Sequence, residues 1–66
     1  MQLKINGKEQ VIEKAGNLAE LVESRGLDRG NIVVEHNHEI IPKDNWAGIR
    51  LKENDNVEII SFVGGG

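Results

Sequence analysis

The sequence predicts an α+β domain of two layers, in which one mixed sheet of four or five strands packs against one helix. Short apolar runs alternate with polar residues at a period of two, and one other stretch repeats its apolar residues at helical spacing. The 66 residues suffice for one small domain but not for a second layer of helices. Such a domain has no room for a deep, walled pocket, so we expect a protein that is not itself an enzyme.

The first predicted element is a hairpin. Apolar residues at positions 1, 3 and 5 alternate with polar ones, as in a half-buried strand, and residues 8–12 form the returning strand. Asn6-Gly7 between them favours the two positive φ angles of a type I′ turn. A two-residue loop would place Leu3 opposite Gln10, a poor match in polarity. A bulge or a longer loop is the alternative, and the register stays open at this point.

A short helix follows the hairpin. Asn17 is a strong N-cap residue, and Glu20 stands three positions later, where the acid of a capping box belongs. Gly26 suits the position that ends the helix. One apolar stripe recurs at spacings of three and four residues: Ala15, Leu18, Leu21 and Val22.

The second half of the chain predicts three more extended segments. Residues 31–36 and 39–41 form two of them, separated by a turn near Asn37-His38, and Pro42 halts the second. The stretch 43–51 shows no periodicity, so we expect an irregular segment in which Trp46 covers one end of the core. Residues 54–56 predict a turn, and residues 57–63 form the last strand.

The last strand offers a candidate docking surface. Because strand residues alternate between faces and Glu58 is unsuited to a small apolar core, Val57 and Ile59 should point inward. Ile60 and Phe62 then lie on the outer face, next to Val63. An exposed apolar group of this kind is typical of a protein contact, so we assign partner docking to Ile60, Phe62 and Val63. The alternative places Phe62 against the edge of the sheet.

Charge and composition exclude several kinds of partner. Eleven acidic and eight scattered basic residues give a net charge of −3, whereas nucleic-acid binding needs a concentrated positive patch. The apolar runs are far shorter than a membrane span, and the N-terminal residues do not resemble a signal peptide, so we expect a soluble, cytoplasmic protein. The chain has no cysteine. It can therefore form no disulfide and no cysteine-based zinc cluster.

Other polar residues receive structural roles. His36 and His38 could share a strand face as two metal ligands do, but no third ligand is evident and a turn should separate them, so we expect no metal site. Asp28, Asp44 and Asp55 stand in turn contexts, where short acids bond to the backbone. We assign no catalytic residue.

The chain ends in three glycines directly after the last strand. Glycine gives the least bulky and most flexible backbone, so Gly64, Gly65 and Gly66 could thread a narrow channel and present the terminal carboxylate to another protein. We therefore divide the chain into a domain of residues 1–63 and a flexible tail of residues 64–66. A frayed end without function is the alternative.

These features together resemble a known family. The order of elements is similar to the β-grasp, or ubiquitin-like, fold. The stretch 37–43 followed by Trp46, the stretch 55–60 and the terminal Gly65-Gly66 resemble the ThiS family, the sulfur carriers of thiamine biosynthesis. The resemblance covers essentially the whole chain. Gly64 departs from the alanine or other small residue expected there.

The resemblance implies a function for the C-terminus. The Gly66 carboxylate would be adenylated by an E1-like enzyme of the ThiF type, which uses ATP and Mg²⁺, and this chain would bind no cofactor itself. A persulfide donor would then convert the adenylate to a thiocarboxylate, which gives its sulfur to a thiazole synthase of the ThiG type. Two alternatives stay open: the small subunit of molybdopterin synthase, and a ubiquitin-like modifier or interaction domain.

Overall fold

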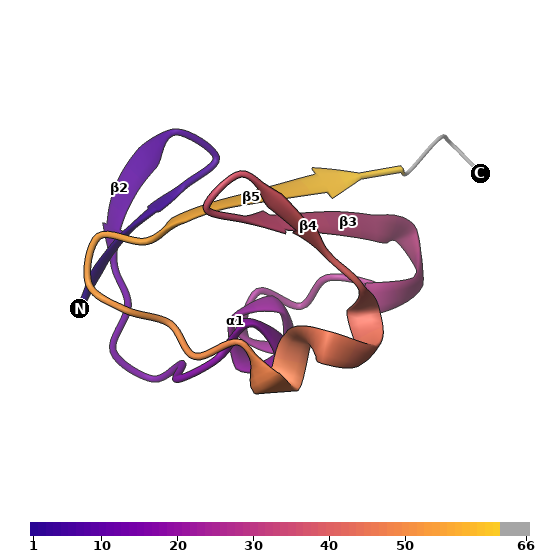
Figure 1. Cartoon of the computed structure of the whole chain (residues 1–66), viewed down its shortest axis with the longest axis horizontal. Helices are drawn as coiled ribbons and strands as arrows, with labels where there is room; N and C mark the ends of the chain where they lie inside the picture. Colours follow the sequence, from indigo (N-terminus) through magenta and orange to yellow (C-terminus); the bar gives the residue numbers. More distant parts are fainter. Residues whose placement is uncertain (63–66) are drawn as a thin grey trace.

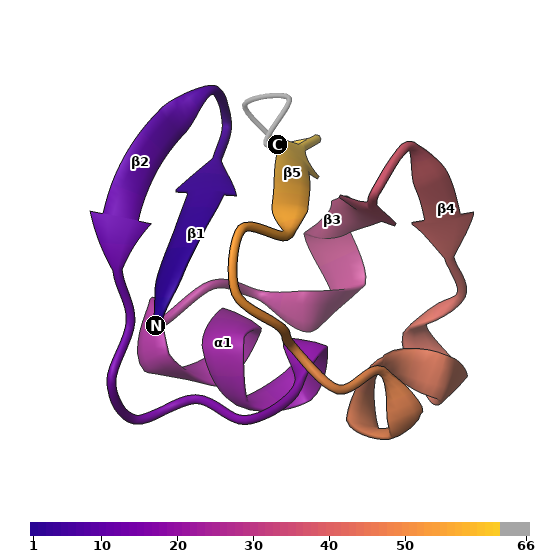
Figure 2. The same cartoon turned by 60° about the vertical axis from the view of Figure 1, so that its left-hand side comes forward.

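The computed structural model describes residues 1–62 and confirms the predicted fold class. One mixed sheet has the strand order β2-β1-β5-β3-β4, and the single α-helix crosses one of its faces (Figure 1). The turned view in Figure 2 shows β5 between β1 and β3, with the helical segments on one side of the sheet. The elements are β1 (Gln2–Ile5), β2 (Lys8–Val11), α1 (Leu18–Ser24), β3 (Ile32–His36), β4 (Glu39–Ile41), β5 (Asn56–Ser61) and two 3-10 helices, η1 (Arg29–Asn31) and η2 (Lys43–Gly48).

The N-terminal hairpin has the tight two-residue loop. Asn6 and Gly7 have φ angles of 51° and 83°, as the predicted type I′ turn requires. The strands pair in the register that the sequence disfavoured, with Leu3 opposite Gln10. This pairing costs little because β2 is an edge strand whose residues stay largely exposed, so its polarity need not match that of the buried face of β1.

The helix α1 begins and ends at the predicted signals. Asn17 Oδ1 accepts a hydrogen bond from the Glu20 N–H at 2.8 Å, which caps the first turn. The Glu20 carboxylate accepts from the Gly16 N–H at 2.7 Å, one residue before the amide that a standard capping box would use. At the other end Gly26 has a φ of 67°, and its N–H donates to the Glu23 carbonyl at 3.0 Å.

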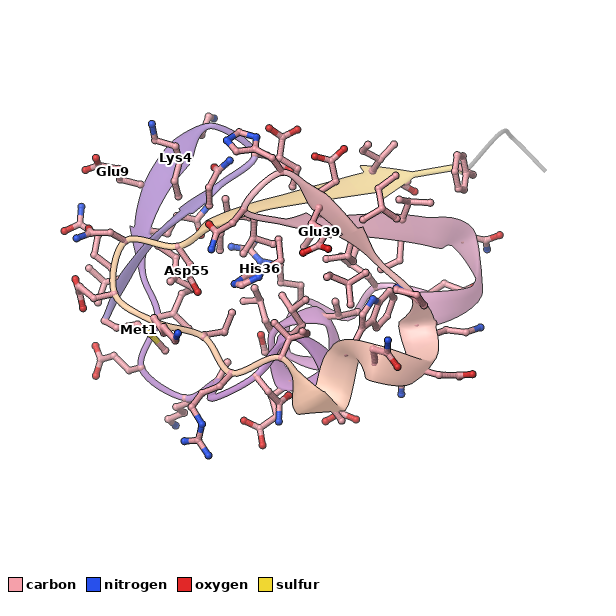
Figure 3. The ribbon with its side chains drawn as sticks, in the orientation of Figure 1. Met1, Lys4, Glu9, His36, Glu39 and Asp55 are labelled. Atoms are coloured by element: carbon pink, nitrogen blue, oxygen red, sulfur yellow. The ribbon has the colours of Figure 1, made fainter. Side chains whose placement is uncertain are left out.

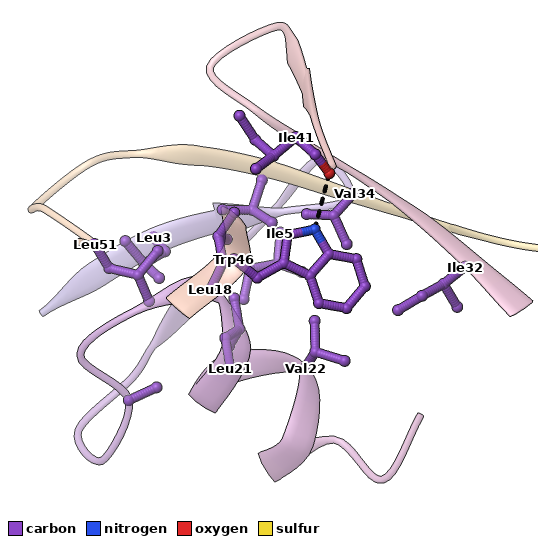
Figure 4. Close-up of a cluster of buried hydrophobic side chains, with 12 residues drawn as sticks. Leu3, Ile5, Leu18, Leu21, Val22, Ile32, Val34, Ile41, Trp46 and Leu51 are labelled. Carbon is purple, nitrogen blue, oxygen red and sulfur yellow. Dashed lines mark hydrogen bonds between the residues drawn. The ribbon is translucent and has the colours of Figure 1, made fainter. Parts of the chain in front are cut away.

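The stretch after Pro42 is more regular than the sequence suggested. Residues Lys43–Gly48 form the 3-10 helix η2, which packs beside α1. Trp46 projects from η2 into the core and is only 1% exposed, so its predicted packing role is confirmed. Figure 4 shows how the indole N–H is satisfied there: Trp46 Nε1 donates to the Ile41 carbonyl at 2.9 Å. This bond fixes η2 against the end of β4.

Two further turns use the left-handed conformation. Asn37 and His38 have φ angles of 50° and 72° and join β3 to β4, as predicted. The last turn lies slightly earlier than expected, because Asn56 already belongs to β5. Asn54 there has a φ of 69°, and the Asp55 N–H donates to the Lys52 carbonyl at 3.1 Å.

Candidate functional site

The strand β5 is the element that leads to the C-terminal residues, and both neighbouring strands hold it in place. It pairs in parallel with β1, where Ile5 lies opposite Val57, and antiparallel with β3 over five residue pairs. The pairing with β3 continues past the strand, since the Phe62 N–H donates to the Asn31 carbonyl at 2.7 Å. The last described residue is therefore anchored to the sheet.

The two faces of β5 differ as the alternation predicted. Val57 is fully buried, and Ile59 points the same way but is only half-buried at the border of the core, less than expected. Ile60 and Phe62 lie on the opposite face with 45% and 60% of their surfaces exposed. The exposed position of Phe62 excludes the alternative in which the ring packs away at the edge of the sheet.

The register brings two more apolar residues to this face. Val33 of β3 lies directly opposite Ile60, and Ile40 of β4 lies opposite Glu35, one position along the same face. Ile40 is 63% exposed, the most exposed isoleucine among the described residues. We define the outer apolar patch as Val33, Ile40, Ile60 and Phe62.

Sequence reasoning missed the contributions of β3 and β4 to this patch. Alternation indicates that only one of the neighbours Ile40 and Ile41 can face the core, which was an available signal. It does not say which one. The pairing with β3 decides, because Ile41 lies opposite the fully buried Val34.

Two acidic residues border the outer apolar patch. Glu35 of β3 and Glu58 of β5 lie directly opposite each other on the same face. Like charges in this position repel, and neither carboxylate takes part in a salt bridge among the described residues. The exposed face of the sheet therefore combines apolar side chains with local negative charge.

A polar contact lies on the inner face of the sheet, near the N-terminal end of β5. His36 Nε2 lies 2.8 Å from Asp55 Oδ2, and Figure 3 shows the two side chains meeting below the sheet. Asp55 also accepts from Asn37 Nδ2 at 3.2 Å and from the Lys52 N–H at 2.9 Å, which confirms its predicted bond to the backbone. Burial alone would raise the pKa of the Asp55 carboxyl, but these hydrogen bonds outweigh it and hold that pKa below its usual value.

This contact also gives His36 a structural role. One nitrogen of its ring is engaged by Asp55, while His38 lies exposed in the turn that follows. Within residues 1–62 no three histidine, cysteine or acidic side chains are grouped as metal ligands would be. Across the same residues no helix has the length and apolarity needed to cross a membrane.

The remaining predicted site residues cannot be placed. Val63, assigned to docking, and Gly64, Gly65 and Gly66, assigned to the tail, lie outside the described residues. The same holds for the proposed boundary between residues 63 and 64. The site that the structure defines is thus the end of β5 with the outer apolar patch around it.

The fold and this site define a class of protein. A five-stranded mixed sheet in the order β2-β1-β5-β3-β4, with one helix across one face and the central strand leading to the C-terminal residues, is a β-grasp domain of the ubiquitin-like kind. The profile of the ThiS family matches residues 2–66. The chain belongs to the ThiS family.

Individual relatives agree with this assignment. The sulfur carrier protein ThiS of Bacillus subtilis is 38% identical over 65 residues, which cover 97% of this chain and 98% of that protein. A crystal structure of the thiamine biosynthesis protein ThiS from Geobacter metallireducens superposes with a TM-score of 0.83 at 30% identity, covering both chains completely. A thiazole synthase of Paramagnetospirillum magneticum is 36% identical over 66 residues, and there the chain spans only 20% of the relative.

Proposed function

We propose that this chain is a sulfur carrier for thiazole formation in thiamine biosynthesis, and that it carries the sulfur on its C-terminus. The observation that supports this most is its similarity over nearly the full length to a protein named as a sulfur carrier. The chain acts as a co-substrate, and the catalytic groups belong to its partner enzymes. Its lack of cysteine is compatible with this role, because the sulfur is held on a carboxyl carbon rather than on a side-chain thiol.

The chemistry explains why the C-terminus needs activation. A carboxylate is a poor electrophile, so an E1-like enzyme joins the Gly66 carboxylate to AMP from ATP and releases pyrophosphate, with its Mg²⁺ neutralising the phosphate charge. The terminal sulfur of a protein persulfide then attacks the acyl carbon, and AMP leaves. The acyl disulfide so formed joins Gly66 to the donor, and a second thiol attacks the donor's sulfur, forming a disulfide with the donor as the bond to the acyl-bound sulfur breaks. The thiocarboxylate released at Gly66 is a sulfur nucleophile.

The described part of the chain is suited to present such a tail. In the proposed division, residues 1–63 form the domain and Gly64, Gly65 and Gly66 thread into the partner. The hydrogen bond from the Phe62 N–H to the Asn31 carbonyl holds the last described residue to the sheet. The partner docks on Ile60, Phe62 and Val63, and the neighbouring Val33 and Ile40 enlarge the surface.

The receiver of the sulfur is proposed to be a thiazole synthase of the ThiG type. Two proteins named thiazole synthase each contain a region similar to the whole of this chain, at 36% and 27% identity. A carrier-like region within the same polypeptide as a synthase is expected if the two act on each other.

The first test is of the tail. Deleting Gly66, or adding one alanine after it, should abolish formation of the acyl adenylate while circular dichroism stays unchanged, because in the proposed division the terminal glycines lie outside the domain. Wild-type protein and a Lys14→Gln variant, changed at an exposed position in the segment between β2 and α1, serve as controls. Normal adenylation of the lengthened chain would refute the carrier function.

The second test distinguishes sulfur transfer from protein conjugation. With ATP, the activating enzyme and a persulfide source, the intact chain should gain the mass difference between sulfur and oxygen, and fragmentation should locate the gain at Gly66. Isopeptide-linked products instead would indicate a modifier. Activity with a molybdopterin synthase large subunit, and none with a thiazole synthase, would indicate the molybdopterin pathway.

A further inference from the structure

The strand β5 has a short open edge beside its C-terminal end. Backbone groups of residues 58, 60 and 62 face β3, so those of residues 57, 59 and 61 face β1. On that side the Asn6 N–H donates to the Val57 carbonyl at 2.9 Å, and β1 then turns away at Asn6-Gly7. Figure 1 shows the tip of the β1–β2 hairpin ending well short of the C-terminal end of β5.

Asn6 marks where the pairing stops. Its side-chain Oδ1 accepts from the Ile59 N–H at 2.7 Å, in the place of the backbone carbonyl that a longer β1 would supply. The next groups on this edge are the Ile59 carbonyl and both backbone groups of Ser61. Within residues 1–62 these three groups have no hydrogen-bond partner. An edge with unpaired groups in strand geometry is a template for another strand.

A groove runs along the inner side of this edge. It has a volume of about 290 Å³ and is lined by Ile5, Asn6, Arg25, Leu27, Ile59 and Ser61. Three of these residues are apolar: Ile5, Leu27 and Ile59. Its one charged residue is Arg25, whose Nη2 donates to Gln10 of β2 and is thereby held at the rim.

From this geometry we propose that the Ile59–Ser61 edge binds an extended segment of the thiazole synthase by β-strand addition. The segment places one apolar side chain in the groove and a carboxylate near Arg25, while its backbone bonds to Ile59 and Ser61. The proposal rests on the proposed function. The synthase would then contact this chain at two places: the outer apolar patch, and the edge of β5 that faces away from β3.

The position of the edge favours the receiving enzyme over a second copy of this chain. The edge ends at Ser61, five residues before Gly66 in the sequence, and two relatives named thiazole synthase contain a region similar to this chain, so we take the receiving enzyme as the occupant. Two copies would each bring a net charge of −3, and the edge offers only three backbone groups for holding them together.

Amide hydrogen exchange resolves the contact without any variant. In the free chain the Ser61 amide should exchange fast and the Phe62 amide slowly, because only the latter donates to Asn31. After incubation of the complex with the synthase in D₂O, exchange is quenched in cold acid before the complex is dissociated and analysed; in the complex Ser61 should exchange about tenfold more slowly or better than in the free chain, with Phe62 as the internal reference. Unchanged exchange at Ser61 in a complex that forms and transfers sulfur overturns the edge proposal and leaves the function intact.

Two variants provide an independent readout. Ser61→Pro removes the N–H on the open side and leaves the ladder to β3, whereas Ser61→Ala keeps the N–H and removes only the hydroxyl. Ser61→Pro should weaken synthase binding roughly tenfold and Ser61→Ala should not. Equal binding of both variants overturns the proposal. Protection of the Ser61 amide in the free chain that rises with protein concentration also overturns it, because a second copy then occupies the edge. Failure of the wild-type chain to bind any synthase counts against both proposals.

Discussion

The two faces of the sheet use similar side chains for opposite purposes. On the inner face, Ile5 is 1% exposed and packs within the cluster that α1 and η2 cover. On the outer face, Ile40 is 63% exposed, with no element of the described chain above it. Burial is what converts an apolar side chain into folding free energy. Exposed apolar side chains in one place leave that free energy available for a partner.

The strand β5 contains this contrast within six residues. Val57 contributes to the core, while Ile60 contributes nothing comparable to folding because it remains 45% exposed. Alternation along a strand assigns the two tasks to neighbouring positions. Substitutions on the two faces should therefore separate stability from binding.

The largest expected effect is on the inner face. Ile5→Ala should lower the free energy of unfolding by about 2–5 kcal/mol, because it removes a fully buried side chain and leaves a cavity. Ile40→Ala, the same substitution on the outer face, should change it by roughly 0.5 kcal/mol or less. Denaturant unfolding of both variants measures the difference. Equal losses would mean that the outer face is also part of the core.

A polar substitution at the inner face comes next. Asp55→Asn should cost about 1.5–3 kcal/mol near neutral pH, the range for hydrogen bonds to a charged group. Because the folded pKa of Asp55 is lowered from its ordinary value of 3.8, its contribution is complete above that unfolded pKa and is lost as the pH falls through the folded value.

Unfolding titrations between about pH 2 and pH 6 check this sign, since the gap between wild type and Asp55→Asn should close at the acid end. The exposed Asp44 provides the matched control, Asp44→Asn, which should show little gap at any pH. A gap that widened in acid would mean that the carboxyl is stabilised in its neutral form.

On the outer face the effect should move from stability to binding. Phe62→Ala should change stability by roughly 0.5 kcal/mol or less. It should weaken binding to the activating enzyme or the synthase by more than about 1 kcal/mol if the ring anchors the interface. Binding titrations measure this directly, with Val11→Ala as a control at an exposed apolar residue of the edge strand β2, which β1 separates from β5. Unchanged binding to both partners would remove Phe62 from the docking surface.

The smallest expected effect is a gain in stability. Glu58→Gln relieves the repulsion from Glu35 directly opposite and should stabilise the free chain by roughly 0.2–1 kcal/mol. The gain should shrink in high salt, which screens exposed charges. If a partner uses this negative charge, the same variant should bind it more slowly at low ionic strength. A loss of stability would contradict the assigned repulsion.

Local signals in the sequence predicted most of the fold. Asn6-Gly7, Asn17 and Gly26 set backbone conformation through their own side chains or lack of one, and each does so in the structure. Alternation along the last strand assigned Val57, Ile60 and Phe62 to the correct faces. These signals act within a few residues, so they can be read without knowing the fold.

The sequence by itself therefore determined the fold class, the turns and helix ends, and the faces of β5. Only the tertiary structure decided the hairpin register, the 3-10 helix around Trp46, the outward position of Ile40 and the contacts of Asp55 with His36 and Asn37. It also decided the open edge at Ser61, which depends on where β1 stops beside β5. The physical reason is the same each time: these features depend on which distant residues become neighbours, and pairing between strands is set by the packed sheet as a whole.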